Sequence, residues 1–541
     1  MAGGLLNLIS TGNNNIILTG NPTKTFFKVT YAKYTNFGLQ KFRIDYDGLR
    51  DLRLTEPSTF TFKMPRYAEL LMDTYIVINL PSIWSPVYNP CTQTGNMWAP
   101  YDFKWIQELG TNMITEISIT CGSQTIQKYS GEYLRAMVER DFSAEKKDLF
   151  DKMTGNIPET NNPGNAFGRT NTYPSAYYQE ATSAEPSIRG SKLYIPINTW
   201  FTLNSRCAFP MIALQYNELY INVTFRPIQQ LFQVRDVFDP GNDFPTMQPD
   251  FNLPQFNMYR FLQTPPVDLT VEKAYSNTTN VWNADIHLLS TYCFLTGEES
   301  RQFAAEDQVY LVKDVFEYNF QNITGTQKVK LTSSGMVANW MIYLQRNDVN
   351  MRNEWSNYTN WPYSYIPFDI INAGIPGPGK NPSGTPLTST GIFVTGKLSP
   401  ENQKEILETM AIVFNGDYRE NVMESGVYNL VEKYVRTKGN AKDGLYCYNF
   451  CLSTDPFEYQ PSGAINLSKF RVVELEVTTY IPPFDIANMS YNIICDPNGN
   501  PIGTTKSSWR LFEYNYNMKV FEERYNILSF IGGNCAMLYA R

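Results

Sequence analysis

The chain has 541 residues, which is too long for a single hydrophobic core and long enough for two large domains. Its 45 basic and 52 acidic residues give a formal net charge of −7 with no long run of one sign, which argues against a protein that coats nucleic acid through a basic surface. The composition favours β-structure. The chain is rich in aromatic residues, with 36 Tyr, 33 Phe and 9 Trp, and its 33 Pro and 33 Gly supply turns between strands.

Residues 1–24 are predicted to form an N-terminal arm. The turn Gly20-Asn21-Pro22 ends it, and an aromatic segment typical of a strand follows. Large aromatic side chains must be buried, so this segment is expected to dock onto a β-surface of its own chain or of a neighbour. We predict a hinge at residues 18–22. The side chains expected to anchor the first strand are Phe26, Phe27 and Tyr31.

The first residues lack the basic flank and the long apolar run of a signal peptide, so none is expected. No segment approaches the ~18 apolar residues of a membrane span, and Ala2 stands where N-myristoylation needs glycine. Scattered cysteines, several in apolar strand-like runs, are expected to be free thiols of a chain made in the reducing cytoplasm. They are Cys91, Cys121, Cys207, Cys293, Cys447, Cys451, Cys495 and Cys535.

The first half of the chain is predicted to form mainly strands. They lie at residues 42–46, 59–63, 70–80, 114–127, 193–197 and 209–225. Cys121-Gly122 predicts a hairpin turn, and residues 132–153 have one of the few helical patterns. Residues 156–190 are rich in turn formers and predict an irregular excursion. The Pro-, Asn- and Asp-rich composition up to residue 283 predicts a domain boundary near its end.

The second half repeats the order of the first. Its predicted strands lie at residues 308–320, 336–344, 409–416 and 461–480, with an irregular excursion at residues 362–397. Gly416 ends an apolar strand as Gly122 does, and Tyr-bearing helical patches follow at residues 133–134 and 428–434. Two diverged copies of one β-unit explain this order.

The predicted fold is therefore all-β, with two consecutive eight-stranded antiparallel jelly rolls, long loop insertions and a few short helices. The arm covers residues 1–24. The first jelly roll, with a long loop at its end, covers residues 25–283, and the second covers residues 284–541.

Few residues suggest catalysis or the binding of a metal or cofactor. The one histidine, His287, lies between apolar neighbours and is interpreted as structural. Cys447 and Cys451 have C-x₃-C spacing without a second Cys or His pair nearby, so we expect no zinc site. The segment GIPGPGK at residues 374–380 has phosphate-loop spacing up to its lysine. Asn381 and Pro382 follow it in place of the Ser/Thr and the helix, so it is interpreted as a surface loop.

Paired carboxylates could serve a glycosidase built on a β-sandwich. The pairs are Glu298-Glu299, Glu522-Glu523 and Glu69 with Asp73, and all are interpreted as solvated surface charges. We predict no catalytic, cofactor-binding or metal-binding residue and no cofactor. Six N-glycosylation sequons occur, at Asn222, Asn277, Asn322, Asn357, Asn466 and Asn488, and most are expected to be silent.

Several segments resemble the major capsid proteins of large double-stranded DNA viruses of eukaryotes, the group that includes chlorella viruses and mimivirus relatives. They are MAGGL, LTGNPTKTFFKVTYAKYTNFG at residues 18–38, SKLYIPINTWFTLNSRCAFPMIALQYNEL at 191–219, FLTGEESRQFA at 294–304, QPSGAINLSK at 460–469 and YNILSFIGGNCAMLYA at 525–540. The likeness extends over nearly the whole chain and thins in the long loops.

The resemblance implies a structural capsid protein with two jelly rolls, which assembles as a homotrimeric, pseudo-hexagonal capsomer and tiles an icosahedral shell. It implies contacts with neighbouring capsomers and with minor capsid proteins, and proximity of the arm to an internal viral membrane. Direct nucleic-acid binding is not expected. The protein would be synthesised and assembled in the host cytoplasm and reside in the virion.

Two other interpretations stay open at this point. One is a β-sandwich carbohydrate-binding protein or glycosidase, which would need an aromatic-lined cleft with two suitably spaced carboxylates. The other is a minor capsid or spike protein, which would not be expected to resemble the family along its whole length.

Overall fold

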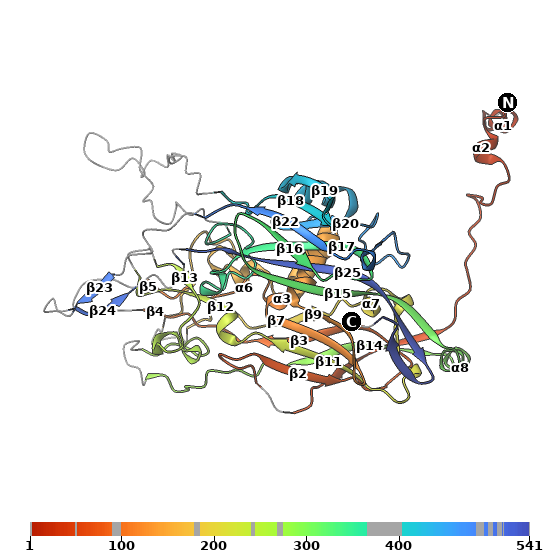
Figure 1. Ribbon diagram of the computed structural model, residues 1–541. Helices are drawn as coiled ribbons and strands as arrows, with labels where there is room; N and C mark the ends of the chain where they lie inside the picture. Colours follow the sequence, from red (N-terminus) through yellow and green to blue (C-terminus); the bar gives the residue numbers. More distant parts are fainter. Residues whose placement is uncertain are drawn as a thin grey trace.

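A computed structural model of the chain describes residues 3–48, 51–88, 99–177, 184–239, 244–267, 274–364, 403–482, 492–495, 501–505, 511 and 513–539. The strands form two bodies packed one above the other, one built mostly from the first half of the chain and one from the second, and the N-terminal arm extends away from both (Figure 1).

The first body contains two facing antiparallel sheets. One has the order β1 (Phe37–Ile44), β14 (His287–Leu295), β3 (Leu70–Leu80) and β10 (Phe209–Pro210), with β9 (Ser191–Pro196) also paired to β3. The other has the order β2 (Ser58–Lys63), β11 (Leu219–Phe225), β7 (Ile114–Cys121) and β8 (Gln124–Tyr129).

The second body repeats this plan. One sheet has the order β15 (Gln308–Ile323), β25 (Tyr516–Ile531), β17 (Met336–Arg346) and β20 (Leu445–Asn449), with β21 (Ile465–Asn466) on β17 and β26 (Asn534–Met537) on β25. The other has the order β16 (Thr326–Leu331), β22 (Val473–Thr479), β18 (Leu407–Phe414) and β19 (Asp417–Glu424).

The two bodies match strand by strand. The order β1-β14-β3-β9 corresponds to β15-β25-β17-β20, and β2-β11-β7-β8 corresponds to β16-β22-β18-β19. The predicted pair of eight-stranded antiparallel jelly rolls is therefore confirmed over the described ranges, and so is the repeat of strand order. The predicted hairpin turn at Gly122 and the predicted turn at Gly416 both pass through a glycine with positive φ, +59° and +95°.

The remaining strands are short: β4 (Val87–Tyr88), β5 (Ala99–Pro100), β6 (Lys104–Trp105), β12 (Phe232–Arg235), β13 (Thr246–Met247), β23 (Asn492–Cys495) and β24 (Pro501–Thr505). The helices are α1 (Gly3–Ile9), α2 (Ile16–Thr19), α3 (Leu109–Asn112), α4 (Gly131–Asp141), α5 (Ala144–Met153), α6 (Pro158–Asn161), α7 (Trp200–Leu203), α8 (Gly297–Ala305), the π-helix η12 (Val427–Val431) and α10 (Glu432–Arg436). Single 3₁₀ turns are η1 (Pro163–Asn165), η2 (Ser205–Cys207), η3 (Met211–Ala213), η4 (Ile228–Gln230), η6 (Pro254–Phe256), η7 (Met258–Arg260), η9 (Val349–Met351) and η13 (Leu467–Lys469). Among the described residues, no helix is both long and apolar enough to cross a membrane.

The rolls share a core. Strand β11 alternates buried and half-buried residues, as its sequence predicts, and its buried face closes the first roll. The same apolar cluster continues into the second roll through Met341, Tyr343 and Phe521 on β17 and β25. A separate cluster that includes Trp340 and Leu475 fills the second roll itself. Strand β17 is buried almost throughout because it has a core on each face.

The predicted division at residue 283 is wrong in one respect. Strand β14, which that division assigns to the second roll, is hydrogen-bonded between β1 and β3 of the first. A jelly roll needs this last strand to complete its sheet, so the first roll continues through Leu295 and the division falls at α8. Composition could not show this, because the pairing joins segments more than 200 residues apart.

The predicted anchoring of the first strand is also wrong. Strand β1 begins at Phe37, and residues 23–36 precede it without a strand. Phe26, Phe27 and Tyr31 are 87 %, 99 % and 88 % exposed, so none of them holds the first roll together. The segment has strand-forming side chains but pairs with no strand of its own chain among the described residues.

The predicted helix at residues 132–153 is two helices. Phe142 is extended between α4 and α5, and the side chain of Ser143 accepts a hydrogen bond from the backbone N–H of Lys146. Serine in this position favours a new helix start over a continuous helix.

Candidate functional site

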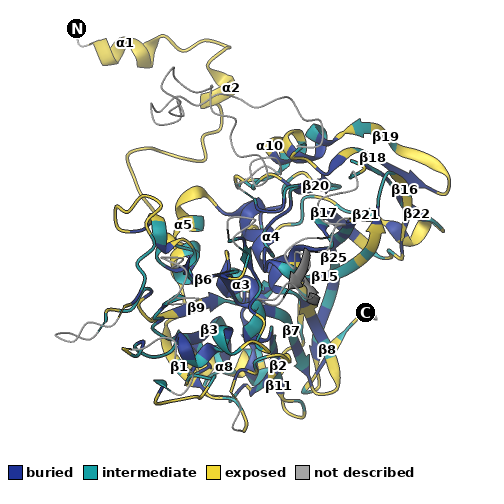
Figure 2. Ribbon diagram, turned by 90° about the vertical axis from the view of Figure 1, so that its left-hand side faces the viewer, coloured by how far each residue is buried: buried dark blue, intermediate teal, exposed yellow. Residues whose placement is uncertain are grey.

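Helix α4 lies buried between the two rolls (Figure 2). All of its 11 residues are buried, including the charged Arg135 and Arg140. Its N-terminus is capped by Ser130, which accepts a hydrogen bond from the N–H of Tyr133 at 3.3 Å. Gly131 permits the close approach to α3, since a Cβ there would lie 1.9 Å from the carbonyl oxygen of Thr111.

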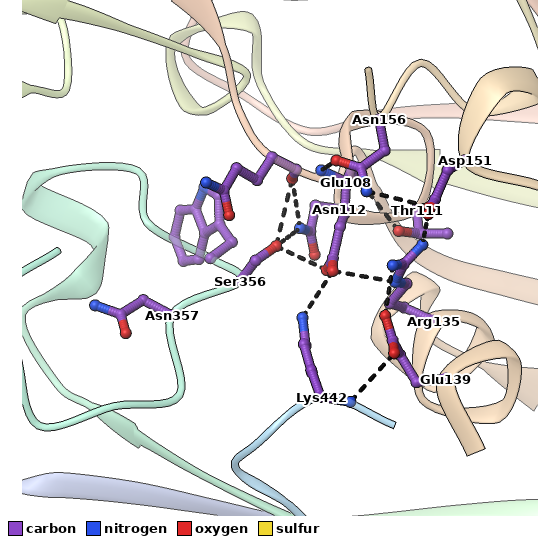
Figure 3. A network of polar contacts seen from close by, with 12 residues as sticks. Glu108, Thr111, Asn112, Arg135, Glu139, Asp151, Asn156, Ser356, Asn357 and Lys442 are labelled. Atoms are coloured by element: carbon purple, nitrogen blue, oxygen red, sulfur yellow. Dashed lines mark hydrogen bonds and ion pairs between the residues drawn. The ribbon is translucent and has the colours of Figure 1, made fainter. Parts of the chain in front are cut away.

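One polar network surrounds Glu108, just before α3 (Figure 3). Its carboxylate lies 3.0 Å from Nε of Arg135 and 2.7 Å from Nζ of Lys442, and it accepts a hydrogen bond from Ser356 at 2.8 Å. Arg135 also pairs with Glu139 in the next turn of α4. The network therefore joins the first roll to two loops of the second.

The Glu108 carboxylate is ionised at neutral pH despite its burial. Burial raises its pKa, but the positive charges of Arg135 and Lys442 outweigh this effect and hold the pKa at about 2. Such a group stays charged only while both cations remain in place.

A second network surrounds Glu523 on β25. Arg140 of α4 lies 2.8 Å from its carboxylate, Tyr133 donates a hydrogen bond to it at 2.9 Å, and Asn339 donates another at 2.8 Å. Arg140 also pairs with Asp141 at 2.7 Å. Burial raises the pKa of Glu523, but chiefly the charge of Arg140 lowers it to about 2.

Glu522 and Glu523 are therefore not the solvated surface charges predicted from the sequence, because both are buried. Being adjacent on a strand, they do point to opposite faces, as expected. Glu522 accepts hydrogen bonds from the indole of Trp340 and the hydroxyl of Ser333, each at 2.6 Å. With one carboxylate on each face of β25, the pair cannot act on one substrate.

The other carboxylate pairs lie apart from both networks. Glu298 and Glu299 are in the first turn of α8, whose N-cap Thr296 accepts a hydrogen bond from Glu299. Glu69 accepts a hydrogen bond from the backbone N–H of Leu295 at 3.1 Å, and Asp73 is half-buried on β3.

His287 and the C-x₃-C cysteines have structural surroundings. His287 is buried at the start of β14, with Nδ1 2.7 Å from the carbonyl oxygen of Asp285. Cys447 and Cys451 are buried and free. Over the described part of the chain, no group of three or more His, Cys, Asp or Glu residues is arranged to hold a metal ion.

The GIPGPGK segment at residues 374–380, Cys91 and the sequon at Asn488 lie outside the described residues. The sequon at Asn357 is fully buried, and its amide donates hydrogen bonds to the carbonyl oxygens of Trp361 and Pro362 at 2.8 and 3.2 Å. A glycan has no room there in the folded chain.

The sequence gives little indication that the charges of α4 are buried between the rolls. Residues 131–141 contain five charged side chains, which usually indicate a solvated helix. Two of their counter-charges, Lys519 for Glu132 and Glu523 for Arg140, lie more than 380 residues away in the second half. The one local clue is the apolar set Tyr133, Leu134, Met137 and Val138, which forms a helix face.

Two exposed apolar surfaces stand out among the residues that the structure describes. The first is the N-terminal arm, which extends in the structure to residue 36, beyond its predicted end at residue 24. Its exposed side chains include Leu6, Leu8, Ile9, Ile17, Leu18, Phe26, Phe27, Val29, Tyr31 and Tyr34. The second is the helical patch of η12 and α10, where Leu430, Val431, Tyr434 and Val435 are 54 % to 91 % exposed.

Two protein-family models match the chain. The model for the major capsid protein N-terminus matches residues 25–263, and the model for the large eukaryotic DNA virus major capsid protein matches residues 299–536. The major capsid protein of Phaeocystis pouchetii virus is 23% identical over 88% of this chain and 93% of its own. The major capsid protein of Paramecium bursaria Chlorella virus 1 is 23% identical over 100% of both chains.

Solved structures agree in fold. A chain from the PBCV-1 virus capsid superposes with a TM-score of 0.59 at 17% identity, covering 96% of this chain and 100% of that one. The Faustovirus major capsid protein superposes with a TM-score of 0.58 at 13% identity, covering 96% and 94%. At these identities the likeness bears on the fold alone.

Proposed function

We propose, from the premise that the chain belongs to the family of major capsid proteins of large eukaryotic DNA viruses, that three copies assemble into a homotrimer whose six jelly rolls form a pseudo-hexagonal capsomer. As a member of this family the protein is a structural component of the virion and not an enzyme.

One observation about the helical connections of the two rolls supports the proposed trimer. The helices α4 and α5 follow β8 in the first roll, and η12 and α10 follow β19, the equivalent strand of the second. Within the chain, α4 is covered by the second roll, whereas the helical patch is uncovered (Figure 2). If each patch is covered by the first roll of the next chain, every roll has the same kind of neighbour.

Such a contact joins two different surfaces, so it generates either an open filament or a closed ring. With two similar rolls per chain, a ring of three chains presents six similar sides, a shape that can tile a shell. Permanent assemblies of this kind bury apolar surface, and Leu430, Val431 and Tyr434 supply it on this face.

Native mass spectrometry tests the proposal. The wild-type chain is expected at three times 62.1 kDa. Replacing Leu430 and Tyr434 by Asp places charge in the proposed contact and should yield monomers with unchanged circular dichroism. The matched control is Phe167→Asp, in an exposed loop of the first roll, which should remain trimeric. A monomeric wild type, or a double variant that stays trimeric, contradicts the proposal.

The arm is proposed to act after the trimer forms, by packing its apolar side chains against a neighbouring capsomer or a minor capsid protein. Its exposure on an otherwise well-packed chain supports this role. Deleting residues 1–17 is expected to leave the trimer intact and to reduce assembly of trimers into larger shells, which light scattering measures. Binding of the arm to lipid vesicles instead would indicate that it faces an internal membrane.

The host cytoplasm is proposed as the place of synthesis and assembly, and the described free cysteines are consistent with it. We propose no catalytic, cofactor-binding or metal-binding role for any residue. The acidic balance of the chain gives no support to direct nucleic-acid binding.

A further inference from the structure

Two cysteines from opposite ends of the sequence lie together where the rolls touch. Cys121 is the last residue of β7 in the first roll, and Cys535 is in β26, the final strand of the second. Their side chains are almost completely buried, at 1 % and 4 % exposure, in the same apolar cluster.

The loop at residues 215–217 holds the two strands against each other. Gly533, next to β26, accepts backbone hydrogen bonds from Gln215 and Tyr216 at 3.0 and 3.2 Å. Asn217 donates a hydrogen bond to the side chain of Asn534 at 3.5 Å. Asn217 also lies against Gly122, where a Cβ would be 2.8 Å from its side-chain oxygen.

Each cysteine is therefore flanked by a residue that contacts the same loop. The two thiols are close enough to interact directly, one hydrogen-bonding to the other. Two thiols that already interact, on segments held by one hydrogen-bonded loop, need little backbone movement to reach the geometry of a disulfide.

We propose that Cys121 and Cys535 form an intramolecular disulfide when the folded chain meets a small-molecule disulfide such as oxidised glutathione. This bond would tie the last strand of the second roll to the first roll.

The exchange balances without any other reactant. The thiolate of Cys121 attacks one sulfur of oxidised glutathione, forms a mixed disulfide and releases one glutathione thiolate. The thiolate of Cys535 then attacks the Cys121 sulfur and releases the second. The protein loses two protons and two electrons, and one oxidised glutathione becomes two reduced molecules.

Cys121 is the better first nucleophile. The hydrogen bond with Cys535 lowers the pKa of the Cys121 thiol, whereas the same hydrogen bond raises the pKa of Cys535. Burial means that a brief opening must precede the first step. Strand β26 has four residues and pairs with β25 alone among the described strands, so this C-terminal strand can open without unfolding either roll.

The bond would close a loop of more than 400 residues and restrict the unfolded chain accordingly. The oxidised protein is therefore expected to unfold at a temperature several degrees above that of the reduced protein. Dithiothreitol should reverse the shift.

The test starts from reduced full-length protein incubated with oxidised glutathione at neutral pH. After acid quenching, denaturation and alkylation, intact mass should show two fewer alkylated thiols per chain, and peptide mapping should find the Cys121 peptide joined to the Cys535 peptide. Cys535→Ser should abolish the loss, and the matched control Cys293→Ser, at a buried thiol on β14, should retain it.

Three results would overturn the proposal. They are full alkylation of wild-type protein after oxidant treatment, a stable glutathione adduct at Cys121 in place of the internal bond, and a disulfide that joins other cysteines. Because the peptide mapping uses wild-type protein, misfolding of a serine variant would leave its result unaffected. The trimer proposal is independent of all three results.

Discussion

The helical connections that follow β8 and β19 occupy equivalent places in the two rolls and have opposite surroundings. Helix α4 has every residue buried, and its Glu132 and Arg140 pair with charges of the second roll, while the η12 and α10 patch exposes Leu430, Val431 and Tyr434. The first connection joins the rolls of one chain, and the second is proposed to join one chain to the next. The duplicated unit thus provides two equivalent helical connections, one that contacts the other roll of the same chain and one that is proposed to contact a roll of the next chain.

The two versions use different chemistry. A buried ion pair gains little over apolar packing but is costly to break, so it favours one arrangement of the rolls over others. The Arg140–Glu523 pair is buried where the two rolls of one chain meet, whereas the apolar side chains of the patch stay exposed until a second chain covers them. This difference fits a contact made once during folding and another made between folded chains.

The largest effect is expected on the internal contact. Replacing Arg140 by Ala leaves Glu523 and Asp141 buried without their main positive charge. The free energy of unfolding should fall by about 3 to 5 kcal/mol, measured by urea denaturation. Lys152→Ala removes an exposed pair with Asp148 and should change it by less than about 0.5 kcal/mol. Equal effects of the two variants would mean that burial does not matter here.

Acid should weaken the same contact. Glu108 and Glu523 have pKa values near 2 in the folded chain against 4.5 as the reference, so their stabilisation is complete above pH ~4.5 and is lost as the pH falls towards 2. Each contributes about 3 kcal/mol at neutral pH by this difference. Asp141 and Glu317, whose pKa values burial raises, oppose part of the loss on acidification.

Thermal unfolding followed between pH 7 and pH 2.5, at one protein concentration, measures the acid effect. Glu108→Gln should lower the midpoint at pH 7 and flatten its dependence below pH 4.5. A variant with the wild-type pH profile would show that Glu108 does not keep its charge in the folded chain.

A pair of tyrosines compares the two connections directly. Tyr133→Phe removes a hydrogen bond to the buried Glu523 carboxylate and should cost about 2 kcal/mol of unfolding free energy. Tyr434→Phe, on the patch and 91 % exposed, should cost nothing measurable in a monomer. Urea denaturation of both variants, in a background that prevents trimer formation, makes the comparison.

The smallest effect on stability is expected in the arm. Phe26 and Phe27 touch little of their own chain, so replacing both by Ala should change the unfolding free energy by less than about 0.5 kcal/mol while shell assembly declines. A large stability loss would restore the prediction made from the sequence, in which these residues anchor the first strand.

Local features were predictable. Alternation predicted β11, a continuous apolar run predicted β3 and β17, and glycine predicted the turns at Gly122 and Gly416. Each depends on neighbours a few residues apart, so the segment alone contains the information. The repeated order of these features also indicated two jelly rolls.

Features that depend on distant partners were not predictable. The assignment of β14 to the first roll rests on its pairing with β1, about 250 residues earlier. The charges of α4 look like those of a solvated helix until Glu523 and Lys519 are seen beside them. The arm has the composition of a strand, but no described strand of its own chain pairs with it.

The sequence by itself therefore determined which segments form strands and turns, and that the unit occurs twice, because periodicity and turn chemistry act over a few residues. The tertiary structure alone decided which helical connection is buried and which is free. That choice depends on whether a second roll lies against it, and the second roll comes from residues hundreds of positions away.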